Sequence, residues 1–321
     1  MKRTDSGSRR AHCEPGHAAG PPVKTADAVW ARQVRVQACA WPTILSGNIR
    51  SVQQAFYEPA GHDCYVATPA TVGPWSPDAQ HGGPPSALAA RALEQHQPDD
   101  RQRLARVAID ILRPVPVGKV SVTTRTIRPG RRITLTEAVM EADGHEVLHA
   151  RGWRIERPSV PVPEIADGEA PGPLPAEGDS KPPSIFRRDD DGYLGSIEWR
   201  FTPGTPPPAG RGAGPTHSRV RAAWTRPRIP LLADEDASPM SRTLLVADSG
   251  SGVGAALAST DFIFINVDLT VTVPRDPVGE WLLLEATTSV GSSGTGLAMT
   301  RLSDRRGAFG RALQTLLVAP R

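Results

Sequence analysis

Residues 82–96 read GGPPSALAARALEQH, and four strand-like runs follow them at about residues 104–113, 119–128, 132–142 and 145–156. The two prolines behind the glycine pair suit the first turn of a helix, where their missing N–H groups cost nothing. Asp143-Gly144 lies between two extended runs, which is a strong hairpin signal. An antiparallel meander has one face to bury, and one helix is enough to fill its concave side. This stretch therefore predicts one helix followed by an antiparallel sheet.

The same order of elements returns in the second half of the chain. Two short strands are predicted at 196–201 and 218–226. A helix is then predicted with Ser238 as N-cap and Pro239 at its first position, running to about residue 252. Strand-like runs follow at about residues 261–273, 281–290, 295–303 and 307–319.

A constant shift relates the two halves. Pro116-Val117-Gly118 recurs as Pro277-Val278-Gly279, 161 residues later, and the same shift takes Trp153 to Gln314. Such internal self-similarity indicates a structural repeat. The expected fold class is α+β, with two helix-plus-antiparallel-sheet repeats in one chain. The domains expected are a disordered N-terminal extension (1–52), a first repeat (53–156), a Pro-rich linker (157–194) and a second repeat (195–321).

Charge and cysteine usage narrow the function. The sequence pI is about 9.0 and the net charge is +3, but residues 1–50 alone hold eight Lys/Arg against three Asp/Glu. The remainder is slightly acidic, which disfavours nucleic acid as a partner. No apolar run is long enough for a membrane span or a signal peptide. The spacing of Cys13, Cys39 and Cys64 fits neither a zinc site nor a disulfide framework, which predicts a reducing, cytoplasmic setting.

Several stretches resemble a known family. Gln80-His81-Gly82-Gly83-Pro84-Pro85 with the following SALAARALE resembles the opening helix of actinobacterial thioesterase-like proteins. VADSGSG, INVDLTVTVPRDPVGEWLLLEA and RALQTLLVAPR resemble the second half of acyl-CoA thioesterase II. The resemblance covers about residues 55–156 and 195–321. It implies a double hot-dog fold with fatty acyl-CoA as the substrate. It also implies hydrolysis of the thioester without a metal, a cofactor or a covalent intermediate.

The resemblance also implies a catalytic set. Its aspartate falls at Asp248 and its glutamine at Gln314. Its hydroxyl position falls at Asn266, which departs from the family's Ser/Thr-type residue. An amide does not replace a hydroxyl fully, so an acyl-CoA-binding protein of the same fold without turnover is the alternative.

The residues carry independent indications. Asp248 follows Met240 and Leu244 at helical spacing on an apolar stripe, where a carboxylate needs partners. It is interpreted as a general base for water, or else as a half-exposed residue at a helix end. Gln314 shares a strand face with Ala312 and Leu316, which suggests either that it orients the water or that it makes a structural hydrogen bond.

Asn266 shares its expected strand face with Phe264 and Asp268, while Ile265, Val267 and Leu269 face the other way. This pattern is typical of a solvated polar face. The alternative is that Asn266 donates a hydrogen bond to the water or to Asp248.

His81, Gly82 and Gly83 precede the first helix and form the expected substrate-binding set. His81 is more typical of a structural histidine than of a base. The functional interpretation is that backbone N–H groups at the helix start face a thioester oxygen or a phosphate. Arg113 and Arg275 near strand starts either meet CoA phosphates or are plain surface charges.

Other function classes fit less well. Gly250, Gly252 and Gly254 follow a helix, which is not the setting of a dinucleotide site. No G-x-S-x-G occurs, so a serine-hydrolase elbow is not expected. An enoyl hydratase of the same fold would want an Asp and a His a few residues apart, and no His follows Asp248 or Asp268 closely. Hot-dog proteins often assemble further through their sheets, so a homo-oligomer is possible, and no residue in the sequence decides the oligomeric state.

Overall fold

The computed structural model describes residues 55–165, 168, 170–179, 192–203 and 218–321. The expected N-terminal extension lies outside these residues, as does part of the expected linker. The helices are α1 (Gly83–Gln95), α2 (Tyr193–Ser196), α3 (Pro239–Ala247) and α4 (Gly250–Val253), with 3₁₀ turns η1 (Pro69–Thr71) and η2 (Glu177–Asp179). The strands are β1 (Tyr57–Pro59), β2 (Cys64–Ala67), β3 (Gln102–Ile111), β4 (Lys119–Arg128), β5 (Ile133–Ala142), β6 (His145–Glu156), β7 (Ile197–Phe201), β8 (Arg221–Pro227), β9 (Phe262–Asn266), β10 (Asp268–Thr272), β11 (Leu282–Val290), β12 (Thr295–Asp304) and β13 (Gly307–Pro320).

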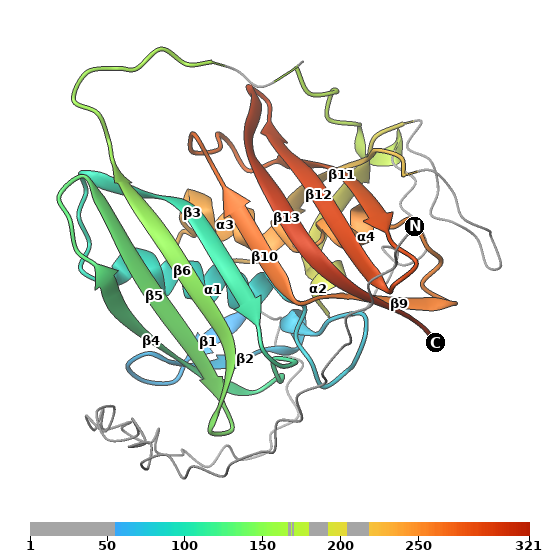
Figure 1. The fold of residues 1–321 in the computed structure, drawn as a ribbon, viewed down its shortest axis with the longest axis horizontal. Coiled ribbons are helices and arrows are strands. Elements are labelled where there is room, and N and C mark those ends of the chain that lie inside the picture. Colours follow the sequence, from blue (N-terminus) through green and yellow to red (C-terminus); the bar gives the residue numbers. More distant parts are fainter. Residues whose placement is uncertain (1–54, 166–167, 169, 180–191, 204–217) are drawn as a thin grey trace, which may run out of the picture. The chain divides into compact units, whose positions relative to one another are not determined.

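The strands form one antiparallel sheet that joins the two repeats edge to edge (Figure 1). The order is β1-β2-β4-β5-β6-β3-β10-β13-β12-β11-β8-β7, and β9 also pairs with β13. The junction is the β3–β10 pair, in which Val107 lies opposite Val271 and Asp110 opposite Asp268. The 161-residue shift makes β3 the counterpart of the β9–β10 segment, with Val107 equivalent to Asp268 and Asp110 to Val271. Each residue therefore pairs with the counterpart of the other, as a local pseudo-twofold axis requires.

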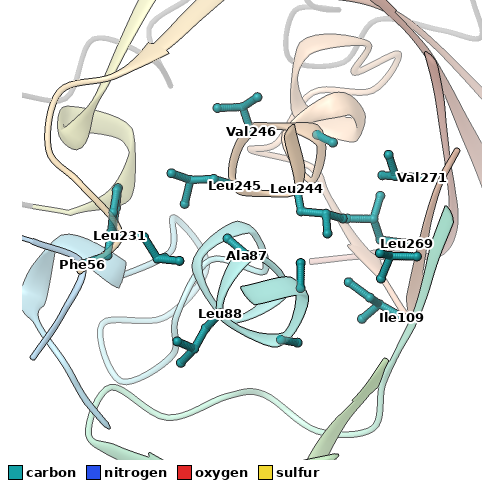
Figure 2. Packing of buried hydrophobic residues seen from close by; sticks show 14 of the residues in the cluster. Phe56, Ala87, Leu88, Ile109, Leu231, Leu244, Leu245, Val246, Leu269 and Val271 are labelled. Carbon is teal, nitrogen blue, oxygen red and sulfur yellow. The ribbon is translucent and has the colours of Figure 1, made fainter. Parts of the chain in front are cut away.

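The two long helices pack side by side against one face of the sheet (Figure 1). They run antiparallel, since Gly83 at the start of α1 lies against Leu245 near the end of α3, and Glu94 near the end of α1 contacts Ser238 at the start of α3. Figure 2 shows Ala87 and Leu244 between the helices, with Ile109 and Leu269 of the joining strands to their right. The small alanines of α1 let the helices approach closely, so one continuous core lies beneath both halves.

The first repeat follows the prediction closely. Helix α1 begins and ends within one residue of the expected limits, with Pro84 and Pro85 buried in its first turn. The hairpin residues Asp143 and Gly144 have φ values of 50° and 76°. Both are left-handed, as the type I′ turn of a two-residue hairpin requires.

Helix α3 begins as predicted, but the expectation that it continues to about residue 252 is wrong. The Ser238 hydroxyl caps it by accepting from Ser241 N at 3.0 Å. A continuing helix would need the Leu245 carbonyl to accept from residue 249. That carbonyl instead accepts from the Tyr193 hydroxyl at 2.8 Å, and Ser249 N turns to Val246 O. The helix therefore stops at Ala247 and resumes as α4, with Asp248 in the break.

The strand expected over 261–273 is also interrupted, at Val267, and the interruption reverses which side chains face inward. Phe264 is buried, whereas Ile265 and Val267 are exposed. Beyond the break Leu269 is buried again. An extra residue in a strand shifts the alternation by one. The expectation that Asn266 and Asp268 share one solvated face is therefore wrong, because Asp268 turns outward to accept from Thr315 N, whereas Asn266 turns inward.

The structure corrects the reading of the cysteines. Cys64 is disulfide-bonded, contrary to the expectation, so cysteine usage no longer supports a reducing setting. Cys13 and Cys39 lie outside the described residues. Within the described part of the chain, no helix combines the length and apolar character that a membrane crossing needs.

Candidate active site

A cavity of about 410 Å³ opens between the start of α1, the end of α3 and strand β9. Apolar side chains from both repeats form most of its wall, including Trp75, Ile111, Leu112, Leu148, Leu194 and Phe264. The polar groups on the wall include His81, Asp248 and Asn266. An apolar cavity with a few converging polar groups is the usual form of a small-molecule site.

Asp248 lies in the break after α3, with its side chain only 4% exposed. A buried carboxylate is costly unless hydrogen bonds compensate for lost water. Asn266 Nδ2 donates to Oδ1 at 2.8 Å and Gln314 Nε2 approaches the same oxygen at 3.3 Å. The second oxygen, Oδ2, lies 3.2 Å from His81 Nδ1. The predicted carboxylate is thus present, buried and held from three elements.

Gln314 meets Asp248 but stands behind the cavity wall. Its amide donates to the Asp248 carbonyl at 2.9 Å and its oxygen accepts from Ser251 N at 3.0 Å. The residue is 1% exposed, on the buried face of β13 as predicted. Since both ends of the amide are occupied, Gln314 fixes the position of Asp248 and the turn into α4.

Asn266 reaches the site because of the interruption at Val267. Its amide donates to Asp248 Oδ1 and, at 3.1 Å, to the backbone oxygen of Asp268. Unlike Gln314, Asn266 lies on the cavity wall. The structure therefore agrees with the alternative expectation for Asn266, in which its amide donates a hydrogen bond to Asp248.

His81 contacts the Asp248 carboxylate, a contact that the sequence did not predict. Its side chain is 11% exposed, and its ring stacks on Tyr193 with centroids 3.7 Å apart and an interplanar angle of 7°. Burial lowers the pKa of His81, and the charge of Asp248 opposes that shift. The ring is therefore neutral over a wider pH range than a free histidine. No histidine follows Asp248 closely in the sequence, but the fold brings His81 of the first repeat against Asp248 of the second.

Gly82 and Gly83 allow this pair to form. A Cβ on Gly82 would lie 2.7 Å from Asp248 Oδ2, and one on Gly83 would strike the Leu245 carbonyl. Gly83 N lies 3.1 Å from His81 Nδ1. Because Pro84 and Pro85 carry no N–H, only these two glycines supply amides at the very start of α1.

Tyr193 is the principal site residue that sequence reasoning missed. It lies inside the range expected to be linker, yet it is buried beneath His81. Its hydroxyl contacts Leu245 O and, at 2.9 Å, Ser249 Oγ. The four large apolar side chains of YLGSIEW, after the Pro-rich run and the charged RRDDD, were the available signal of a buried segment.

The two arginines considered for CoA phosphates have different surroundings. Arg113 lies on the cavity wall. Arg275 is held by Asp304 at 2.6 and 2.8 Å and by Gly307 O, away from the cavity. In the described residues, His, Cys, Asp and Glu side chains form no cluster of three or more that would suit a metal ion.

Comparisons with known proteins concern the family and the fold. The sequence profile of the acyl-CoA thioesterase N-terminal domain matches residues 71–155, and that of the C-terminal domain matches residues 169–318. Together they cover well over half of the chain. No curated protein matches it.

Solved structures show the same architecture. A protein described as a thioesterase II from Thermobifida fusca has a TM-score of 0.65 at 18% identity, over 83% of this chain and 96% of its own. An acyl-CoA thioesterase II from Mycobacterium marinum has a TM-score of 0.57 at 15% identity, over 83% and 95%. A hot-dog protein of unknown function from Alicyclobacillus acidocaldarius has 0.57 at 15%, over 80% and 93%. The fold is a double hot dog.

Proposed function

The chain belongs to the acyl-CoA thioesterase family, and from this premise we propose that it hydrolyses the thioester of fatty acyl-CoA with Asp248 as general base. The observation that carries the proposal is the buried Asp248 carboxylate on the wall of an apolar cavity, held by amides and a histidine. Turnover of such substrates would place the protein in lipid metabolism.

The proposed reaction needs no covalent intermediate. Asp248 takes a proton from a water molecule whose oxygen attacks the thioester carbonyl carbon. The carbon–sulfur bond then breaks, and the proton passes to the leaving thiolate. The products are the free acid and the CoA thiol. Asn266 holds Asp248 and faces the same space, so it is suited to contact the water as well. Gln314 acts as a positioning residue.

His81 is proposed to connect the carboxylate with the helix start. One ring nitrogen cannot accept from Gly83 N–H and donate to Asp248 at the same time. An ionised Asp248 favours the tautomer with its hydrogen on Nδ1, directed at Oδ2. Of the two glycines at the helix start, Gly82 lies on the cavity wall, and its N–H is proposed to face the thioester oxygen, where a backbone amide stabilises developing negative charge.

The cavity wall suits the proposed substrate. Its aliphatic and aromatic side chains would cover an alkyl chain, whose burial stabilises binding by about 0.8 kcal/mol per methylene. Arg113 is the cation on this wall and is proposed to face the CoA phosphates.

A thiol-release assay over a series of acyl-CoA chain lengths tests the proposal. Asp248→Asn should lower kcat by at least about 10²-fold, the scale of a lost general base. The matched control is Asp110→Asn, on the exposed side of β3. Intact acyl-CoA at every chain length, with Asp248→Asn no different from wild type, would refute hydrolysis.

Two other outcomes have their own meaning. Tight binding of acyl-CoA without thiol release would select the non-catalytic binding protein, in which the Asn266 amide donates to Asp248 without supporting turnover. Hydration of a 2-enoyl-CoA without thiol release would instead assign the His81–Asp248 pair to hydratase chemistry.

A further inference from the structure

A second cavity, of about 470 Å³, lies at the opposite ends of the same two helices. It opens between the C-terminal half of α1 and the start of α3. Its wall is far more polar than that of the first cavity and includes Arg91, Glu94, Arg154, Ser238, Met240 and Asp276. None of these residues takes part in the site around Asp248.

The two cavities lie at the two crossings of the same antiparallel helices. Because α1 and α3 are antiparallel, the end of each helix meets the start of the other. At one crossing Asp248 of the second repeat lies against Gly82 of the first. At the other, Glu94 of the first repeat lies against Ser238 of the second. A carboxyl beside a helix N-terminus, on a cavity wall, therefore occurs twice.

The Glu94 carboxyl is placed to exchange protons near neutral pH. The Ser238 hydroxyl donates to Oε2 at 2.5 Å. Burial raises the pKa of Glu94 to about 7, and the Ser238 hydrogen bond opposes that shift. A general base is most effective when its pKa lies near the working pH.

The charged groups around Glu94 are mostly paired with one another. Arg91 is held by Glu235 through two hydrogen bonds of 2.6 and 2.7 Å, and Arg103 lies 3.4 Å from Asp276. Asp276 faces Glu94 from the segment after β10 and contributes to the raised pKa. Arg157 also lies 3.3 Å from Asp276, and Asp99, Asp100 and Asp236 line the same cavity.

Two donors on the wall lack a protein acceptor. At the start of α3, Pro239 has no N–H and Ser241 N–H is taken by Ser238, which leaves the Met240 N–H. Arg154 is 5% exposed, and its Nε has no hydrogen-bond partner among the described residues, although its Nη1 donates to Gln97 O at 2.9 Å. A buried donor without a partner is costly, so a bound acceptor at this place would be stabilised.

We propose that this cavity is a second thioester-hydrolysing site, in which Glu94 activates water for a short acyl group that ends in a hydrogen-bond acceptor. The inference rests on the proposed function of the first site. Glu94 takes a proton from water, the water oxygen attacks the carbonyl carbon, the carbon–sulfur bond breaks, and the proton leaves with the thiolate. The carbonyl oxygen faces the Met240 N–H and the far end of the acyl group meets Arg154. A long alkyl chain would remove water from the charged side chains of the wall, which favours a short polar acyl group.

The test uses the full chain, with thiol release from palmitoyl-CoA and succinyl-CoA as the readout. Four proteins are compared: wild type, Asp248→Asn, Glu94→Gln and the double variant. Glutamine keeps an oxygen that accepts from Ser238, so the fold should be retained, and circular dichroism checks this. Glu146→Gln, an exposed carboxyl on β6, is the matched control.

Asp248→Asn should lose palmitoyl-CoA hydrolysis and keep succinyl-CoA hydrolysis, with a rate that rises with pH through a midpoint near 7. The double variant should lose at least about 10²-fold of that remaining rate. Succinyl-CoA hydrolysis that is absent in wild type, or abolished by Asp248→Asn alone, or unchanged by Glu94→Gln, overturns the inference. Palmitoyl-CoA hydrolysis that survives Asp248→Asn overturns the proposed function separately.

Discussion

Replacing Gly82 by alanine tests the close approach of the two repeats at the candidate active site. Gly82 has φ −64° and ψ −17°, which alanine adopts freely, so backbone strain adds nothing. The new Cβ would lie 2.7 Å from Asp248 Oδ2 and 2.9 Å from its Cγ. Ordinary contact begins at 3.4 Å, so the carboxylate must retreat by about 0.7 Å. Misplacing a catalytic group by about 1 Å costs on the order of 10²-fold in rate.

We therefore expect Gly82→Ala to lower kcat for acyl-CoA hydrolysis by roughly tenfold or more. Loss of a glycine N-cap should cost about 1 kcal/mol at most, so the fold remains. Steady-state thiol release and urea unfolding measure the two effects. Gly118→Ala is the control, because its Cβ would meet nothing within 4 Å. If Gly82→Ala and Gly118→Ala have the same kcat, the positional argument for Asp248 is incorrect.

Three further predictions concern the groups around the two carboxyls. Gln314→Leu should destabilise the fold by about 1–3 kcal/mol and lower kcat, because Asp248 and Ser251 each lose a partner; unchanged urea unfolding would contradict this. His81→Phe keeps an aromatic ring for stacking and should lower kcat more than it changes KM. Since folding lowers the pKa of His81, wild-type stability should also fall as pH drops below 6.5, a loss that the variant should lack in pH-dependent melts. Folding raises the pKa of Glu94 from 4.5 to about 7, so wild-type stability should fall as pH rises between these values. Glu94→Gln should remove up to about 3 kcal/mol of this change in the free energy of unfolding. If wild type and Glu94→Gln lose the same stability between pH 5 and pH 8 in thermal melts, the raised pKa of Glu94 is refuted.

Local patterns were enough to predict most elements of the fold. The proline pair placed the start of α1, Ser238 placed the start of α3, and Asp143-Gly144 placed a hairpin that has the required left-handed φ values. Each of these signals depends on a few neighbouring residues. The family resemblance then identified Asp248 and Gln314, which the structure brings together.

The errors arose where a distant residue overrides a local pattern. The sequence after Ser238 predicts a helix to about residue 252, but the Tyr193 hydroxyl takes the Leu245 carbonyl that the next turn needs. The alternation of β9 and β10 looks unbroken until Asp268 is seen to bond to Thr315 instead of facing the site. The contact between His81 and Asp248 crosses from one repeat to the other, so no spacing along the chain could reveal it.

The pairing of a histidine from one repeat with a carboxylate from the other has an evolutionary consequence. A symmetric dimer of identical single repeats would be obliged to install the same side chains at both helix crossings. Fusion into one polypeptide removes that obligation, since each copy mutates alone. In this chain one crossing is lined mainly by apolar side chains and the other by many charged ones, a difference that two identical subunits could not show.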